Sequence, residues 1–123
     1  MEINELITNA HKNAVEHGFW EDYEFVIDGE SVAKEINEVE ATQSVKSMKN
    51  NAISTRLMLI VGEVSEAQEG LRHNDIDNFK VELADVAIRL ADLCGGLEID
   101  LEAEIEKKME KNKNRPYKHG KSF

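Results

Sequence analysis

Apolar residues recur at helical spacing along most of the chain. The first such stretch runs from about Glu2 to His17, and Gly18 is a suitable C-terminal stop. A long helix is expected from about Ala52 to Arg72. A third helix is expected from about Asp77 to Cys94, ended by the pair Gly95-Gly96.

A fourth helix is expected after Asp100, because aspartate is a preferred N-cap residue and acidic positions follow it. This helix should stop before Pro116, because the residue preceding a proline avoids the α region. The segment 19–51 is harder to interpret, since it combines aromatic residues with an Asp28-Gly29 turn signal. We expect its first dozen residues to form a loop. Short connections between the other helices favour an all-α antiparallel helical bundle.

The third helix is apolar around most of its circumference. Its polar stripe occupies an arc of roughly 80° at about 100° per residue and consists of Glu82, Asp85, Arg89 and Asp92. A helix of this kind must be surrounded by protein. Because so few helices leave apolar surface uncovered in one subunit, we expect homo-oligomerisation, as a homodimer or a dimer of dimers, to complete the bundle.

The net charge is −10, but the charges are unevenly distributed: residues 1–106 hold 24 acidic against 8 basic residues, whereas 107–123 hold 7 basic residues and one acidic residue. The acidic body argues against binding a nucleic-acid backbone. The longest apolar run, 57–61, is too short to cross a membrane. With no signal pattern at the N-terminus and a single cysteine, Cys94, which we expect to be buried, a cytoplasmic location is expected.

Two acidic pairs carry the candidate chemistry: Glu63 with Glu66, and Glu82 with Asp85. Residues three apart share one helical face, so antiparallel packing of the two helices brings the four carboxylates together. The spacing alone is common in so acidic a chain. Position selects these pairs, because Glu63 and Glu66 border the apolar stripe of their helix, whereas Glu69 lies on the solvent side.

Clustered carboxylates repel one another and resist ionisation. One resolution is internal ion pairing with Arg56 and Arg89, which describes a non-catalytic helical module. The other is a divalent cation. Hard oxygen donors without histidine or thiolate suit Mg²⁺ or Mn²⁺. The pattern leaves both open.

The chain resembles the MazG-like all-α nucleoside triphosphate pyrophosphohydrolases over roughly residues 52–121. The resemblance lies in E-x-x-E at Glu63 and Glu66, E-x-x-D at Glu82 and Asp85, and a downstream K-x-x-x-N at 108–112. It implies a single domain over 1–123, with a core of about 52–115 and a basic tail at 116–123. The partners implied are a nucleoside triphosphate and a second copy of the chain.

The resemblance also implies a reaction. The four carboxylates would bind Mg²⁺, and metal-activated water would attack the α-phosphate of a nucleoside or deoxynucleoside triphosphate. The products would be the monophosphate and pyrophosphate, and the role would be cleansing or control of a nucleotide pool. A phosphohydrolase that releases orthophosphate and a nucleotide sensor without turnover are the rival interpretations, beside the helical module.

Further candidate residues come from the resemblance or from their position in the chain. Lys108, Asn112 and Arg115 would contact phosphate, or form a basic helix end that the helix dipole favours. Trp20 would stack on the base, or pack in the core or in a dimer contact. His17 would hydrogen-bond a base edge, or have a structural role at the helix end. Arg89 and Asp92 would orient the carboxylates.

Overall fold

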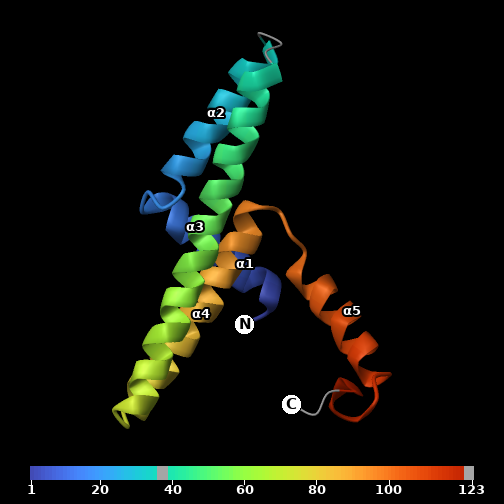
Figure 1. Cartoon of the computed structure of the whole chain (residues 1–123). Coiled ribbons are helices and arrows are strands. Elements are labelled where there is room, and N and C mark those ends of the chain that lie inside the picture. The colour runs from blue at the N-terminus through green and yellow to red at the C-terminus, as the bar shows by residue number, and fades with distance from the viewer. Residues whose placement is uncertain (36–38, 121–123) are drawn as a thin grey trace.

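The computed structural model describes residues 1–35 and 39–120, which are all-helical (Figure 1). Its elements are α1 (Ile3–Glu16), α2 (Glu21–Glu35), α3 (Val39–Arg72), α4 (Ile76–Gly96), α5 (Leu101–Lys113) and a 3-10 turn at Tyr117–Gly120. The all-α prediction is confirmed. Within the described ranges, no helix is long and apolar enough to span a bilayer.

Several predicted helix ends are confirmed, but the predicted start of the long helix at Ala52 is wrong, because α3 already begins at Val39 and packs against α2 over its N-terminal part. Gly18 has φ +82° and follows α1, which is the left-handed conformation that favours glycine at a helix end. Asp100 accepts a hydrogen bond from the Ala103 backbone N–H at 3.1 Å and so caps α5. Helix α4 is two residues longer than expected at its C-terminus, because it includes Gly95 and Gly96.

The prediction of a loop after Phe19 is wrong, because residues 21–35 form α2. Val26 and Ala33 of this helix are buried. A Cβ added at Gly29 would meet Val45 of α3 at 3.8 Å, so this glycine lies at the α2–α3 contact and does not mark a turn. Packing against α3 therefore outweighs the local Asp28-Gly29 turn signal.

Helix α3 is the central element of the fold. It is 34 residues long, with α2 packed along its N-terminal part and α4 antiparallel to its C-terminal part (Figure 1). Helix α1 packs on α4, and Gly95 permits the close approach: a Cβ there would lie 2.6 Å from the Cβ of His11. Helix α5 contacts α1 near its start and then diverges from the α3–α4 pair (Figure 1).

The core forms where α1, α2, α3 and α4 meet. Trp20, Ala14 and Leu93 are buried there, and partly buried apolar residues surround them: Tyr23, Ile53, Ile60 and Leu97. Cys94 is buried, as predicted.

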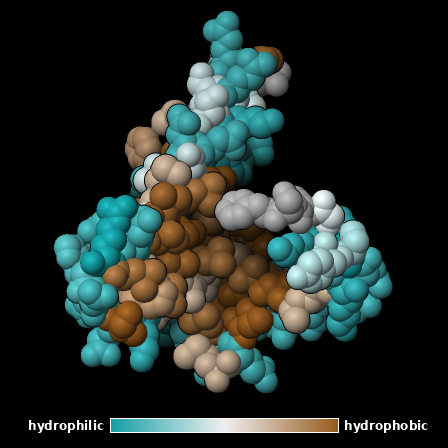
Figure 2. Space-filling model, turned by 60° about the horizontal axis from the view of Figure 1, so that its bottom comes forward, coloured by the Kyte–Doolittle hydropathy of each residue, from teal (hydrophilic) through white to brown (hydrophobic). Residues whose placement is uncertain are grey.

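The expectation that α4 is surrounded by protein is not met within one chain. Leu83 is 49% exposed and Leu90 is 39% exposed, and on α3 Leu57 and Val64 are 48% and 52% exposed. Figure 2 shows a broad apolar area at the centre of one face, with hydrophilic surface on both sides of it. Exposed apolar surface of this extent is typical of a protein-contact face.

Candidate active site

Three of the four predicted carboxylates lie together between α3 and α4. Each of Glu63, Glu82 and Asp85 is partly buried and offers an oxygen within 4.8 Å of the others. The antiparallel packing of α3 and α4 produces this cluster from residues 19 and 22 positions apart. Glu66 is exposed and lies outside the group, although its charge still acts on Glu82. Glu69 is on the solvent side, as predicted, and pairs with Arg72.

The electrostatics of the cluster are unequal. The Arg89 Nε atom donates a hydrogen bond to Glu63 at 2.7 Å and holds the pKa of Glu63 below its usual range. The pKa of Glu82 is raised, first by its hydrogen bond with Glu63, then by burial and by the charges of Glu63, Asp85 and Glu66. One arginine therefore balances only part of the negative charge.

The expectation that Arg56 neutralises the acidic cluster in the helical-module alternative is wrong. Arg56 is 7% exposed, and its guanidinium donates to Asp22 at 2.7 and 3.2 Å, to the Phe19 carbonyl and to the Ala52 carbonyl. The same guanidinium lies 3.9 Å from the centre of the Trp20 ring. This arginine belongs to the core and to the α2–α3 contact.

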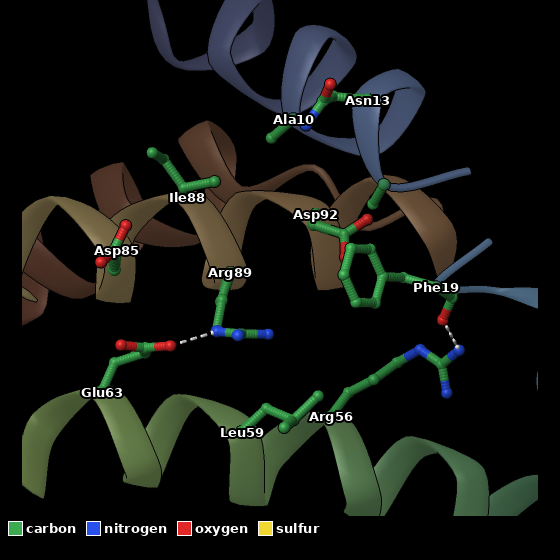
Figure 3. A pocket seen from close by; sticks show the side chains of 11 residues that line it. Ala10, Asn13, Phe19, Arg56, Leu59, Glu63, Asp85, Ile88, Arg89 and Asp92 are labelled. Atoms are coloured by element: carbon green, nitrogen blue, oxygen red, sulfur yellow. Dashed lines mark hydrogen bonds and ion pairs between the residues drawn. The ribbon is translucent and has the colours of Figure 1, made fainter. Parts of the chain in front are cut away.

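A pocket extends from the acidic cluster to the end of α1 (Figure 3). Glu63 and Asp85 lie at one end, and Phe19 and Asn13 lie at the other. Its volume of about 260 Å³ is close to the lower end of the range for small-molecule sites, enough for part of a nucleotide. Its walls are mainly apolar, from Ala10, Ala14, Leu59 and Ile88.

Trp20 is placed in the core and not on this pocket. It is 3% exposed, its indole N–H donates to Asp92 at 2.7 Å, and Arg56 covers one face of its ring. A Cβ at Gly96 would lie 2.0 Å from the ring, so the backbone at Gly96 packs directly against the indole. In this arrangement the indole offers no open face to a base.

Two other predicted residues have structural contacts. His17 is exposed at the end of α1, and its Nδ1 atom lies 2.7 Å from the Asn13 backbone carbonyl. Asp92 lines the pocket, but its partners are Trp20 and His11 and not the carboxylates. Arg89 does contact one of the carboxylates, Glu63.

The structure does not bring the basic C-terminal residues to the acidic cluster. Lys108 and Asn112 lie on the part of α5 that diverges from α3 and α4 (Figure 1). Lys108 is exposed, whereas the Asn112 Oδ1 atom is buried without a hydrogen-bond partner. Helix α5 ends at Lys113, so Arg115 does not continue the helical face of the other two.

Six pocket-lining residues were not predicted as site residues: Ala10, Asn13, Ala14, Phe19, Leu59 and Ile88. Of these, Asn13 is the polar one and Phe19 the aromatic one. Asn13 shares a face of α1 with Ala10 and Ala14, and a polar residue on a face of small apolar residues is a usable signal. Phe19 gave no such signal, because its position depends on the turn between α1 and α2.

The family model described as MazG nucleotide pyrophosphohydrolase domain matches residues 51–119, more than half of the 123 residues. No curated protein and no solved structure gave a match. The chain belongs to the MazG nucleotide pyrophosphohydrolase family. The matched segment contains Glu63, Glu82 and Asp85, as well as α5.

Proposed function

We propose that this protein hydrolyses a nucleoside or deoxynucleoside triphosphate to the monophosphate and pyrophosphate, with Mg²⁺ or Mn²⁺ as cofactor. The observation that carries the proposal is the convergence of Glu63, Glu82 and Asp85. Two of the three, Glu63 and Asp85, line one end of a pocket. The family match supports the reaction class.

The donor set fits a hard divalent cation. All three side chains present carboxylate oxygens from two packed helices, and the raised pKa of Glu82 reflects negative charge that a cation would relieve. Bound Mg²⁺ would supply Lewis-acid activation of the phosphate and of the attacking water. We propose Glu63, Glu82 and Asp85 as ligands, with Glu66 joining them through a change of side-chain rotamer.

The residues beside the cluster have supporting roles in this proposal. Arg89 holds the Glu63 carboxylate through its Nε atom, so it orients a ligand and its remaining N–H groups face the middle of the pocket (Figure 3). Leu59 and Ile88 supply apolar surface along which the sugar would lie. Phe19, which is 62% exposed, takes the base-stacking role that Trp20 does not offer.

We also propose that residues 1–123 form one domain that assembles as a homo-oligomer through the apolar area of Figure 2. Light scattering should give at least twice the chain mass of 13.9 kDa. A monomer at micromolar concentration contradicts this. The tail 116–123 is included, with 121–123 lying outside the described residues.

Assembly also gives a role to α5. Because α5 diverges from the acidic cluster of its own chain, we propose that Lys108 and Asn112 contact phosphate at the site of a partner copy. Mixing Glu63→Gln subunits with Lys108→Ala subunits should then restore turnover that each lacks alone. Absence of restored turnover in confirmed mixed oligomers contradicts a shared site.

The function is tested by a panel of nucleoside triphosphates with Mg²⁺ and identification of both products. Monophosphate plus pyrophosphate is expected, and Asp85→Asn should abolish it. Glu69→Gln is the matched control, because Glu69 is exposed on α3 and pairs with Arg72 and His73. Orthophosphate as the product indicates a phosphohydrolase. If the protein binds nucleotide without turning it over, it is a sensor. If it binds neither metal nor nucleotide, it is a helical module.

A further inference from the structure

At the end of the pocket away from the acidic cluster, the Asp92 side chain is a hydrogen-bond acceptor whose orientation is fixed. Asp92 Oδ1 accepts a hydrogen bond from Trp20 Nε1 at 2.7 Å and lies 3.0 Å from His11 Nδ1. Among the described residues, no hydrogen bond reaches Asp92 Oδ2. Because the two contacts on Oδ1 hold the carboxyl group in place, Oδ2 is an oriented acceptor on a pocket-lining side chain that is 18% exposed.

The spacing along α4 suits a nucleotide. Asp85 and Asp92 are seven residues apart, so they lie on one face of the helix, about 10 Å apart along its axis at 1.5 Å per residue. A triphosphate at the Asp85 end therefore extends its sugar along the apolar walls and its base toward Asp92. Phe19 and Asn13 border this base end (Figure 3).

Asn13 complements Asp92. Its side-chain amide, which makes no hydrogen bond within the described part of the chain, offers both a donor and an acceptor. Arg56 lies at the same end, but both of its terminal nitrogens are bound to Asp22, Phe19 and Ala52 oxygens, and its Nε atom is buried. The guanidinium is therefore not presented to a carbonyl group on a base.

We propose that the pocket selects bases with an exocyclic amino group beside an unprotonated ring nitrogen, as in cytosine and adenine, over their oxo counterparts. This inference rests on the proposed function. The amino group donates to Asp92 Oδ2, and the Asn13 amide donates to the ring nitrogen. An oxo base places a carbonyl oxygen against the carboxylate oxygen, which leaves two acceptors facing each other.

The test uses substrate pairs that differ only at this group: dCTP against dUTP, and ATP against ITP. We expect kcat/KM to favour the amino member of at least one pair by about tenfold or more. Equal values, or a preference for the oxo member in both pairs, overturn the inference.

Asp92→Asn should reverse the preference. The Trp20 indole N–H still donates to the side-chain oxygen of the substituted residue. The amide NH₂ group therefore takes the position of Oδ2 and donates to the carbonyl of an oxo base. Asn13→Asp is a second variant that does not touch Trp20. It replaces the donor with an acceptor and should shift selectivity in the same direction. Unchanged selectivity in both folded variants contradicts the assignment.

Failure of this inference is distinguishable from failure of the proposed function. Hydrolysis of all four triphosphates at equal kcat/KM removes the base preference and leaves the function. If none is hydrolysed, equilibrium binding of dCMP against dUMP still tests the preference. Tighter binding of dCMP, lost in Asp92→Asn, supports it, whereas equal binding overturns it.

Discussion

The two ends of the pocket differ in how their charges are balanced. At the base end, Arg56 is stacked on Trp20 and bound to Asp22, and Asp92 is held by the indole N–H. At the other end, Arg89 pairs with Glu63 alone among three clustered carboxylates, and the pKa of Glu82 is raised by its neighbours. At the Arg56 end the cation is paired with Asp22, whereas the acidic cluster retains negative charge that a divalent cation would balance.

This difference separates structural from functional charge. A buried arginine with every terminal N–H group engaged contributes to folding, and its loss should be measured as lost stability. Crowded carboxylates are unfavourable for folding, and their loss should be measured as lost activity. The following variants test that separation.

The largest effect is expected for Glu82→Gln. Turnover should fall by on the order of a hundredfold or more, because a carboxylate that binds the cation is lost. The melting temperature in EDTA should be unchanged or higher, because a repelling charge is removed. Enzyme assays and thermal unfolding measure the two effects. A variant that keeps most of its activity contradicts the assignment of Glu82 as a ligand.

Arg56→Met should show the opposite balance. Loss of the hydrogen bonds to Asp22 and to the Phe19 carbonyl, and of the contact with Trp20, should cost about 2–3 kcal/mol of unfolding free energy. Urea unfolding measures this cost. Full stability would mean that Arg56 is not part of the core.

Two glycines compare the packing at the two ends. Gly96→Ala should lower stability by about 1–3 kcal/mol, because its Cβ would lie 2.0 Å from the Trp20 ring. Gly62 is the matched control beside Glu63: an added Cβ there meets nothing within 4 Å. Gly62→Ala should therefore raise stability by up to about 1 kcal/mol through helix propensity. Equal effects in urea unfolding would contradict the tight packing around Trp20.

The smallest effect is expected from the pH dependence of the Asp22–Arg56 pair. The hydrogen bond from Arg56 lowers the pKa of Asp22 in the folded state. The pair therefore stabilises the fold above the unfolded-state pKa of about 4, and this contribution is lost as the pH falls through the lower folded-state value.

Asp22→Asn should accordingly cost stability at pH 7, by less than about 1 kcal/mol, because the Asp22 side chain is 54% exposed. Urea unfolding of both proteins at pH 7 and pH 3 measures the cost, which should shrink at pH 3. A cost that grows on acidification has the wrong sign for this pair.

Local sequence signals predicted much of the fold. Asp100 caps the start of α5 with its side chain, and Gly18 adopts the positive φ that follows the end of α1. Both helix ends were therefore predictable from the residue types. Helix α2 was not, because the burial of Val26 and Ala33 against α3 overrides the Asp28-Gly29 signal. Tertiary packing decided that segment.

The candidate site was also predictable only in part. Helical periodicity placed Glu63, Glu82 and Asp85 on facing surfaces, and the structure brings them together. The partner of Arg56 was not predictable, because it depends on where α2 packs. Base-stacking by Trp20 was inferred from the family resemblance, whereas the structure surrounds that ring with Arg56 and Gly96.

The central claim is that the three carboxylates form a divalent-cation site, and a Mn²⁺ titration followed by electron paramagnetic resonance tests it most directly. We expect the wild-type protein to bind Mn²⁺, Glu82→Gln to weaken binding by at least about tenfold, and Glu69→Gln to leave binding unchanged. A wild-type protein that binds no Mn²⁺, or equal binding by all three proteins, would contradict this claim.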